Sequence, residues 1–237
     1  SDVTVDAFVP SSIKAKLSAS SDRVTAQDTL NVTTRFIYDD PAPEIAVSGY
    51  MNLRPAEHPV EKYQDYDFGS SDGEQFYLNV ESGITDKTGV LRIPLDEMAQ
   101  HELNRPYQID LRLDVTDPNA KVLSYAKTFP VLFSGNLVGV KKDFSKENPY
   151  ETDFGVILAD QTGALHGGEV NYSIFRRHIS YQYVMREGSW QFVRNEYKTP
   201  VTAGKIKVGP DTNARLRQVL QDGSYVAEFT SGNVTST

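Results

Sequence analysis

The sequence predicts an all-β fold made of two tandem antiparallel β-sandwiches, and three observations support this prediction. Between Tyr107 and Val115 apolar and polar residues alternate, which is the period-two pattern of a strand with one face in a core and one in water. The 13 Tyr and 11 Phe favour strands, because aromatic side chains pack well on a pleated surface. The layout of strands and turns also recurs with an offset of roughly 120 residues, the size of a small domain.

Composition and charge indicate a globular chain that does not bind nucleic acid. Hydrophobic residues make up 39% and charged residues 24% of the 237 positions, enough for one large domain or two ordinary ones. The formal net charge of −8 argues against nucleic-acid binding, because such binding depends on neutralising phosphates. No apolar run approaches the ~20 residues that span a bilayer, and no signal-peptide pattern opens the sequence, so we expect a soluble piece.

The sequence contains no cysteine. This excludes a disulfide framework, a thiolate nucleophile and a zinc–thiolate site within these residues. Small extracellular animal proteins usually carry disulfides, so the absence of cysteine favours a bacterial or intracellular origin.

We expect the first β-sandwich to occupy residues 1–134, with a short lead-in at 3–10, and to meet the second near the break Ser134-Gly135-Asn136. The acidic, tyrosine-rich region 55–72 is expected to be a long loop. Asp96 can cap a short helix at 95–103, although a loop fits almost as well. Alternating apolar residues between turn residues predict strands at 13–17, 30–38, 45–53, 76–80, 90–95, 107–115 and 122–133.

The second β-sandwich is expected at residues 135–237, with the same layout and a first strand at 137–140. Asp222-Gly223 predicts a hairpin between 216–220 and 225–229, because this dipeptide suits a type I′ turn. Little sequence follows residue 229, so we expect this sandwich to be truncated at its C-terminus, without its closing strand. Three segments of the second sandwich match segments of the first. Residues 154–160 match 36–39, residues 170–175 match 47–53, and residues 225–229 match 107–113.

The region 176–217 stands out because basic residues outnumber acidic ones there and aromatic residues lie among them. One interpretation is an antiparallel hairpin around Glu187-Gly188, with apolar side chains turned to the core and cations at its edge. The other is a surface that binds single strands or glycans by stacking. We favour the hairpin, whose predicted core-facing side chains are Ile179, Tyr181, Tyr183 and Met185.

No catalytic site is predicted, and we expect neither enzymatic activity nor a cofactor. The histidines lack H-E-x-x-H spacing, and the sequence has no G-x-S-x-G elbow or Gly-rich phosphate loop. The sequence alone does not show whether Ser, His and Asp side chains lie close enough to form a catalytic triad. The four histidines are His58, His101, His166 and His178.

One cluster of carboxylates raises the hypothesis of a calcium site. An EF-hand loop that begins at Asp65 places Gly69 at position 5 and Phe76 at position 12, where oxygen ligands are required. We therefore favour a solvated acidic loop and expect no bound metal. The cluster consists of Asp65, Asp67, Asp72 and Glu74.

A resemblance to a known family rests on VDAFVPSSIKAKL, on FIYDDPAP followed by VSGYMNLRP, and on FPVLFSGNLVGVKKDF leading to FGVILADQTGALHGGEVNYSIFRRHISYQYVMREGSWQF. Over essentially the whole chain these stretches resemble bacterial α2-macroglobulin-like proteins, which are large periplasmic protease inhibitors built from many macroglobulin domains. The resemblance implies two tandem macroglobulin-like domains, each a seven-stranded antiparallel β-sandwich of the Ig/fibronectin III-like kind.

The resemblance also implies a mechanism to which this stretch supplies only a part. In that family a protease cuts an exposed bait region, the inhibitor collapses around it, and a thioester from a Cys-Gly-Glu-Gln-type motif traps the attacker covalently. Without cysteine, this stretch carries neither the thioester nor a lipid-modified N-terminal cysteine. It therefore resembles two interior domains that form structural framework of a broad-spectrum protease inhibitor.

The partners implied by the resemblance are target proteases, met through the full-length protein, and the other macroglobulin domains of the same chain. Cell-wall synthesis proteins are a further candidate. The implied location is the periplasm, with anchoring to the inner membrane only through a lipid outside this stretch, and the implied role includes evasion of host defences.

Trypsin-like proteases cut exposed Arg and Lys in mobile loops, so the resemblance makes residues 197–204 a candidate for the bait region or its neighbourhood. The bait-proximal candidates are Arg194, Lys198 and Lys205, and the alternative places the bait beyond Thr237. A function of another class also stays open. It is an extracytoplasmic binding module, an adhesin or a carbohydrate-binding sandwich, that uses the aromatic region.

Overall fold

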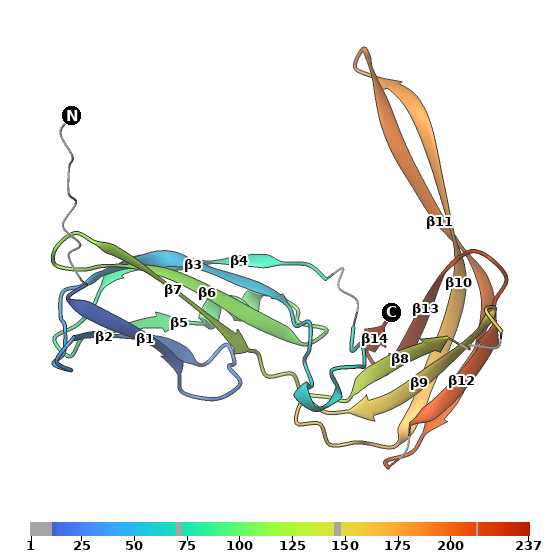
Figure 1. Ribbon diagram of the computed structural model, residues 1–237, viewed down its shortest axis with the longest axis horizontal. Helices are drawn as coiled ribbons and strands as arrows, with labels where there is room; N and C mark the ends of the chain where they lie inside the picture. Colours follow the sequence, from blue (N-terminus) through green and yellow to red (C-terminus); the bar gives the residue numbers. More distant parts are fainter. Residues whose placement is uncertain (1–10, 70–72, 145–147, 212) are drawn as a thin grey trace, which may run out of the picture. The chain divides into compact units, whose positions relative to one another are not determined.

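The computed structural model describes residues 11–69, 73–144, 148–211 and 213–237 (Figure 1). These residues form fourteen β-strands and two short 3-10 helices, which confirms the all-β prediction. The chain divides into two compact units, each built from two stretches of sequence. The first unit consists of Ser1–Ala56 and Gly73–Leu132, and the second of Glu57–Asp72 and Phe133–Thr237.

The first unit is a sandwich of two antiparallel sheets. A three-stranded sheet has the order β1-β2-β5, and a four-stranded sheet has the order β4-β3-β6-β7. The strands are β1 (Ile13–Ala19), β2 (Thr29–Phe36), β3 (Ala46–Pro55), β4 (Phe76–Ile84), β5 (Val90–Pro94), β6 (Tyr107–Thr116) and β7 (Val122–Pro130).

Strand β6 shows why the sequence folds this way. Its apolar residues are all buried and the residues between them are not, as period-two alternation predicts. The buried set joins side chains from the facing sheet, such as Leu30 and Val32, in one core. The predicted helix is reduced to a 3-10 helix, η2 (Asp96–Gln100), in which Met98 is buried. The buried residues of β6 are Tyr107, Ile109, Leu111, Leu113 and Val115.

The second unit repeats this architecture strand for strand. Its sheets have the orders β12-β9-β8 and β11-β10-β13-β14, so β9, β10 and β13 take the places of β2, β3 and β6. This confirms the correspondence that the repeated sequence pattern predicts. The strands are β8 (Leu137–Phe144), β9 (Glu151–Ala159), β10 (Gly168–Arg186), β11 (Ser189–Val208), β12 (Ala214–Val219), β13 (Ser224–Ser231) and β14 (Val234–Ser236).

One expectation for the second unit is wrong. The Asp222-Gly223 dipeptide joins strands of different sheets, because β12 pairs with β9 while β13 pairs with β10 and β14. The turn residues mark the change of direction, but the sheets determine which strands pair. Strand β14 pairs with three residues of β13, whereas β7 pairs with nine residues of β6, and the expected truncation stays a prediction. The expected lead-in at 3–10 lies outside the described residues.

Two turns, at Thr88-Gly89 and Thr162-Gly163, share one geometry. The carboxylate of Asp86 accepts hydrogen bonds from the hydroxyl of Thr88 at 2.6 Å, its amide at 2.8 Å and the amide of Val90 at 3.0 Å. Asp160 makes the equivalent set with Thr162 and Ala164. These hydrogen bonds lower the pKa of Asp86 to about 2, and the bond from the Thr88 hydroxyl contributes most.

The described residues of the expected loop at 55–72 are largely irregular, as predicted, and residues 57–69 are a structural part of the second unit. We name residues 57–69 the clasp segment. It includes the 3-10 helix η1 (Glu61–Tyr63). Val60 and Phe68 of the clasp segment are buried in one cluster with Leu137 and Ile157. These two partners lie on the face of the β8–β9 sheet opposite to Val138 and Val156, which belong to the sandwich core. The sheet is therefore buried on both faces.

Gly139 makes room for the clasp segment. A Cβ atom at this position falls 2.7 Å from the ring of Phe68, closer than real contacts allow. The backbones of Asp67 and Val140 exchange two hydrogen bonds of 2.8 Å, which fix the segment to the edge of β8. The hydroxyl of Ser236 donates a further bond of 3.0 Å to the carbonyl of Asp67. The clasp segment is thus held by both packing and backbone pairing.

We expect Phe68→Ala to destabilise the second unit by about 3–5 kcal/mol, because it leaves a cavity against the sheet. Gly139→Ala is expected to cost about 1–3 kcal/mol through the clash with the same ring. In the double variant the clash with the ring is removed while the close contact with Cγ1 of Ile157 at 2.8 Å remains, so the two costs should add only in part. Denaturant unfolding measures all three. Gly69→Ala, with open space around its Cβ position, is the control, and additive costs would contradict this packing.

The Asp86 turn predicts a specific loss of stability in acid. The folded state keeps this carboxylate ionised to about pH 2, whereas an unfolded Asp titrates near pH 3.9, so the stabilisation is present above about pH 4 and is lost as the pH falls through 2. The difference in unfolding free energy between the wild type and Asp86→Asn should therefore shrink between pH 5 and pH 2. Glu102→Gln controls for the loss of one exposed charge, and a pH-independent difference would refute the assignment.

Candidate functional site

The candidate site is the outer part of the β10–β11 hairpin, residues 178–198, which we name the arm. Strands β10 and β11 pair along their whole length, from Gly168 opposite Val208 to Arg186 opposite Ser189. Strand β13 supports β10 only between Asn171 and Arg177. Beyond that point the hairpin continues as a two-stranded ribbon (Figure 1).

The turn at the tip of the arm is the one that the sequence predicts. Glu187 and Gly188 both have positive φ, 49° and 77°, as the two central positions of a type I′ turn require. Such a turn suits the right-handed twist of the strands that it joins, and Gly188 has no Cβ to oppose its φ. The predicted hairpin around Glu187-Gly188 is therefore confirmed.

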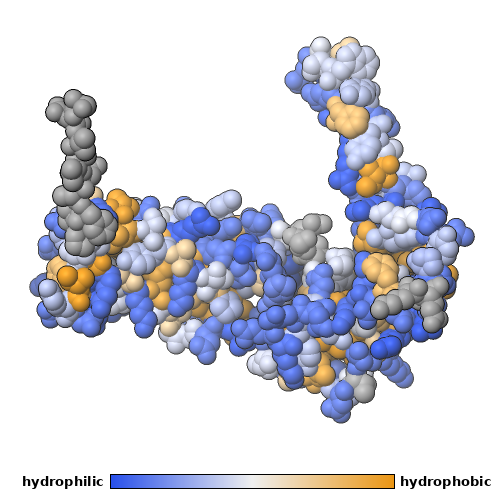
Figure 2. Space-filling view, in the orientation of Figure 1, coloured by the Kyte–Doolittle hydropathy of each residue, from blue (hydrophilic) through white to orange (hydrophobic). Residues whose placement is uncertain are grey.

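One face of the arm is aromatic and open to solvent. Directly opposed residues of antiparallel strands share a face, so Tyr181, Tyr183 and Met185 lie with Phe192 and Trp190. The ring of Phe192 stacks on Tyr181 with centroids 5.1 Å apart, and meets Tyr183 edge-on at 5.0 Å. Tyr183, Trp190 and Phe192 are 68%, 65% and 60% exposed. In Figure 2 a few hydrophobic patches appear among hydrophilic residues along the arm.

The prediction that Ile179, Tyr181, Tyr183 and Met185 turn to the core is therefore wrong. All four are classed with the exposed side chains, from 37% exposed for Ile179 to 68% for Tyr183. The physical reason is the length of the hairpin, because β10 passes the end of β13 and leaves the sandwich behind. No sequence pattern within the hairpin marks where the third strand stops.

The three bait-proximal candidates lie on a regular strand and not on a mobile loop, since 197–204 is part of β11. Each candidate is in an exposed ion pair. Arg194 bonds Glu196 at 2.6 Å, Lys198 bonds Glu228 of β13 at 3.1 Å, and Lys205 bonds Glu169 of β10 at 2.7 Å. Exposed pairs of this kind contribute about 0–1 kcal/mol each. The pairs do not bring the three cations to a common point.

The hairpin is basic in an acidic chain. Between Gly168 and Val208 seven Arg and Lys stand against three Glu, a net charge of +4, whereas the whole chain carries −8. Two of the basic residues, Arg176 and Arg177, also bond the residues that precede and begin β13, the carbonyl of Asp222 and the hydroxyl of Ser224. The base of the arm is therefore a positively charged region.

The four histidines make local contacts and form no common site among the described residues. His101 stacks on Phe76 at 4.1 Å, His166 bonds Asp160 at 3.2 Å, and His178 stacks on Tyr197 at 4.7 Å. His58 lies in the clasp segment. Within the described ranges no three His, Asp or Glu side chains are grouped so that they can hold a metal ion.

The carboxylate cluster is dispersed by the fold. The carboxylate of Asp65 bonds Lys141 of β8 at 2.7 Å, and Asp67 pairs through its backbone with Val140. Asp72 lies outside the described residues. The positions that an EF-hand would use therefore serve the attachment of the clasp segment.

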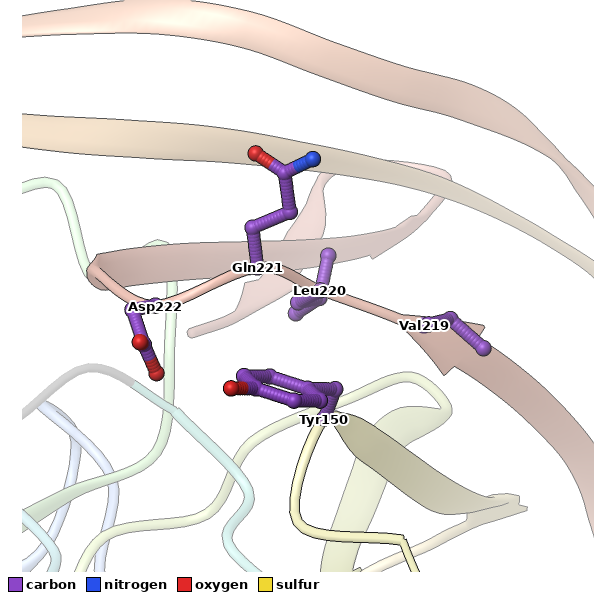
Figure 3. Close-up of a pocket in the computed structure, with 5 residues that line it drawn as sticks. All are labelled: Tyr150, Val219, Leu220, Gln221 and Asp222. Carbon is purple, nitrogen blue, oxygen red and sulfur yellow. The ribbon is translucent and has the colours of Figure 1, made fainter.

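A pocket of about 410 Å³ lies between the end of β12 and the chain that enters β9 (Figure 3). The ring of Tyr150 and the side chain of Leu220 lie next to each other there, and the amide of Leu220 donates to the carbonyl of Tyr150 at 2.7 Å. Asp222 supplies the carboxylate among the lining residues. The polar lining also includes the hydroxyl of Tyr150 and the amide of Gln221.

The helices of the described part are too short to cross a membrane.

Comparisons with known proteins agree with this architecture. Residues 12–128 match the family described as the bacterial alpha-2-macroglobulin MG5 domain, and residues 139–237 match the family described as bacterial macroglobulin domain 6. A comparison with curated proteins gives no match.

Among solved structures, Salmonella alpha-2-macroglobulin reacted with methylamine is similar, with a TM-score of 0.81 and 16% identity over 98% of this chain. The native conformation of E. coli alpha-2-macroglobulin gives 0.81 and 15% over 97%. The E. coli protein activated by porcine elastase gives 0.77 and 16% over 97%. This chain spans 16%, 16% and 21% of the three chains.

At such identities the solved structures show a shared fold, and the two family matches carry the assignment. Both matches follow the division into sandwiches, the first within β1 to β7 and the second within β8 to β14. The chain therefore belongs to the bacterial alpha-2-macroglobulin family, within which it carries an MG5 domain followed by macroglobulin domain 6.

Proposed function

We propose that the chain is structural framework of a protease-trapping inhibitor and has no catalytic activity of its own. The observation that carries the proposal is the pair of consecutive macroglobulin domains. One similar solved protein is described as activated by porcine elastase, which associates that relative with a protease. Because the chain spans only part of its relatives and contains no cysteine, thioester chemistry is the task of other segments.

The proposed setting follows the family. The chain works in the periplasm beside the other macroglobulin domains of a longer protein, whose lipid anchor lies outside this stretch. Its other partners are the target proteases, which meet the full-length inhibitor. The boundary between the two domains near Ser134-Gly135-Asn136 remains a proposal. The second unit also requires the clasp segment, which lies in the first half of the sequence.

We further propose that the arm is the bait-proximal, protease-exposed part of the chain. A two-stranded hairpin is marginally stable in water, so opening is easiest at the tip and harder where β13 adds a third strand. Arg194 lies opposite Tyr181, in the two-stranded part. Lys198 lies opposite Arg177, the last position that β13 supports, and Lys205 lies opposite Asn171 within the four-stranded sheet.

Limited trypsin digestion tests this gradient. We expect cleavage after Arg186 at the tip earliest, and among the three candidates after Arg194 first, after Lys198 more slowly, and after Lys205 only when the second unit unfolds, because proteolysis follows the population of the open form. Intact-mass analysis of a time course identifies the sites. Arg194→Gln should remove only the Arg194 product, without speeding cleavage at Lys205. Equal rates at Arg194 and Lys205 would overturn the bait-proximal proposal.

The exposed aromatic face supports a second candidate function, an extracytoplasmic glycan-binding module. Trp190 is the single tryptophan of the chain and lies on this face, so its emission reports directly on a ligand there. Under this candidate, oligosaccharides of glucose or N-acetylglucosamine should shift the emission saturably. Phe192→Ala should then weaken binding roughly 5- to 150-fold, the equivalent of about 1–3 kcal/mol for one stacked ring.

The matched control for that titration is Val193→Ala. Val193 lies opposite Gln182 and therefore on the other face of the arm, so its loss should leave glycan binding unchanged. Emission that stays constant at millimolar oligosaccharide excludes the glycan-binding candidate and leaves the inhibitor framework.

A further inference from the structure

The aromatic face of the arm changes from apolar to charged between the tip and the base of the hairpin. Opposed residues of β10 and β11 form five rows across this face. The two rows nearest the tip are apolar, the next two join an apolar side chain to a charged one, and the last joins two cations. From tip to base the rows are Met185 with Trp190, Tyr183 with Phe192, Tyr181 with Arg194, Ile179 with Glu196, and Arg177 with Lys198.

The opposite face of the ribbon is mostly polar near the tip. Successive side chains of a strand alternate between faces, so the residues between those of the aromatic face all lie on the other side. Apart from Val184 and Val193 they are polar or charged. They are Ser180, Gln182, Val184, Arg186, Ser189, Gln191, Val193 and Asn195. The arm is therefore an amphipathic ribbon, and burial from water is favourable for one face alone.

The apolar part of the aromatic face is too small for an ordinary protein interface. The seven residues from Ile179 to Met185 span about 24 Å, and two paired strands make a surface about 10 Å wide. The resulting area of about 240 Å² compares with about 800 Å² on each partner of a stable protein complex. A bilayer surface sets no such minimum, because each ring that enters it adds its own transfer free energy.

Charge is distributed so that an anionic surface attracts the hairpin and repels the rest of the chain. The hairpin from Gly168 to Val208 carries a net charge of +4, whereas the whole chain carries −8. At the base of the arm, Arg176 bonds a backbone carbonyl and Arg177 bonds the hydroxyl of Ser224, so neither of these bonds cancels a positive charge. The field of the molecule therefore orients the arm toward negative charge.

We propose that the arm is a membrane-docking element whose ligand is the headgroup region of an anionic phospholipid bilayer. The rings of Tyr183, Trp190 and Phe192 enter the interface, where Trp and Tyr are enriched because one end of the side chain is apolar and the other is polar. The cations at the base of the face lie at the lipid phosphates, and the polar face stays in water. This docking is independent of protease trapping, and its ligand is a lipid surface and not a sugar.

A vesicle titration of the whole chain tests the proposal, with Trp190 as the single reporter. Vesicles of phosphatidylglycerol and phosphatidylethanolamine should shift its emission to shorter wavelength and sediment with the protein. Phosphatidylcholine vesicles should bind at least about fivefold more weakly, the effect of about one basic residue at an anionic surface. Binding to the anionic vesicles should also weaken at about 1 M salt, where the Debye length is about 3 Å.

Two substitutions on opposite faces separate docking from a general effect on the arm. Phe192→Ala should lower the affinity for anionic vesicles roughly tenfold, because it removes one ring from the interface. Val193→Ala, on the polar face, should leave the affinity unchanged. Arg177→Gln should lower the affinity for anionic vesicles about fivefold and leave that for phosphatidylcholine unchanged.

Three results would overturn the proposal. The first is an emission spectrum that anionic vesicles leave unchanged, and the second is an equal loss of affinity in Phe192→Ala and Val193→Ala. The third is self-association of the chain without lipid that Phe192→Ala abolishes, which would assign the aromatic face to a second copy of the chain.

Discussion

The contact between Phe68 and Gly139 is the interaction on which the second unit depends most. A β-sheet in a sandwich usually buries one face and leaves the other to water. The β8–β9 sheet buries both, because its outer apolar residues Leu137 and Ile157 are covered by the clasp segment. Glycine at position 139 is what lets an aromatic ring reach this surface. The side chain that completes the second sandwich therefore comes from a segment inserted between two strands of the first.

Much of the fold could be predicted from the sequence, and the failures have physical causes. Strand β6 was predictable because alternation reports directly which face is buried. The clasp segment was not, since Val60 and Phe68 stand alone in a polar stretch and no period shows what they touch. The Asp222-Gly223 turn was predictable as a turn, but its flanking strands belong to different sheets. Pairing between strands is a property of the whole sandwich.

The candidate site was predictable in composition but not in exposure. Basic and aromatic residues in the region 176–217 indicate a hairpin, and the tip at Glu187-Gly188 follows from local turn chemistry. The rings of Tyr183 and Phe192 face solvent because the pairing of β13 with β10 ends at the base of the arm. Strand β13 lies far from these rings in the sequence, so the hairpin itself does not reveal this. The same ribbon therefore carries both the proposed protease-exposed segment and the aromatic face of the second candidate function.

The clasp segment also sets an order of events during synthesis. As the chain leaves the ribosome, Val60 and Phe68 emerge well before Leu137 and Ile157, the residues that bury them. Most strands of the first sandwich are available to fold in this interval, while the ring of Phe68 in the clasp segment is still exposed to water. Contacts of such sequence separation form slowly, because a long loop must close first. A nascent chain of this length therefore exposes a specific apolar site that a chaperone can bind until β8 and β9 arrive.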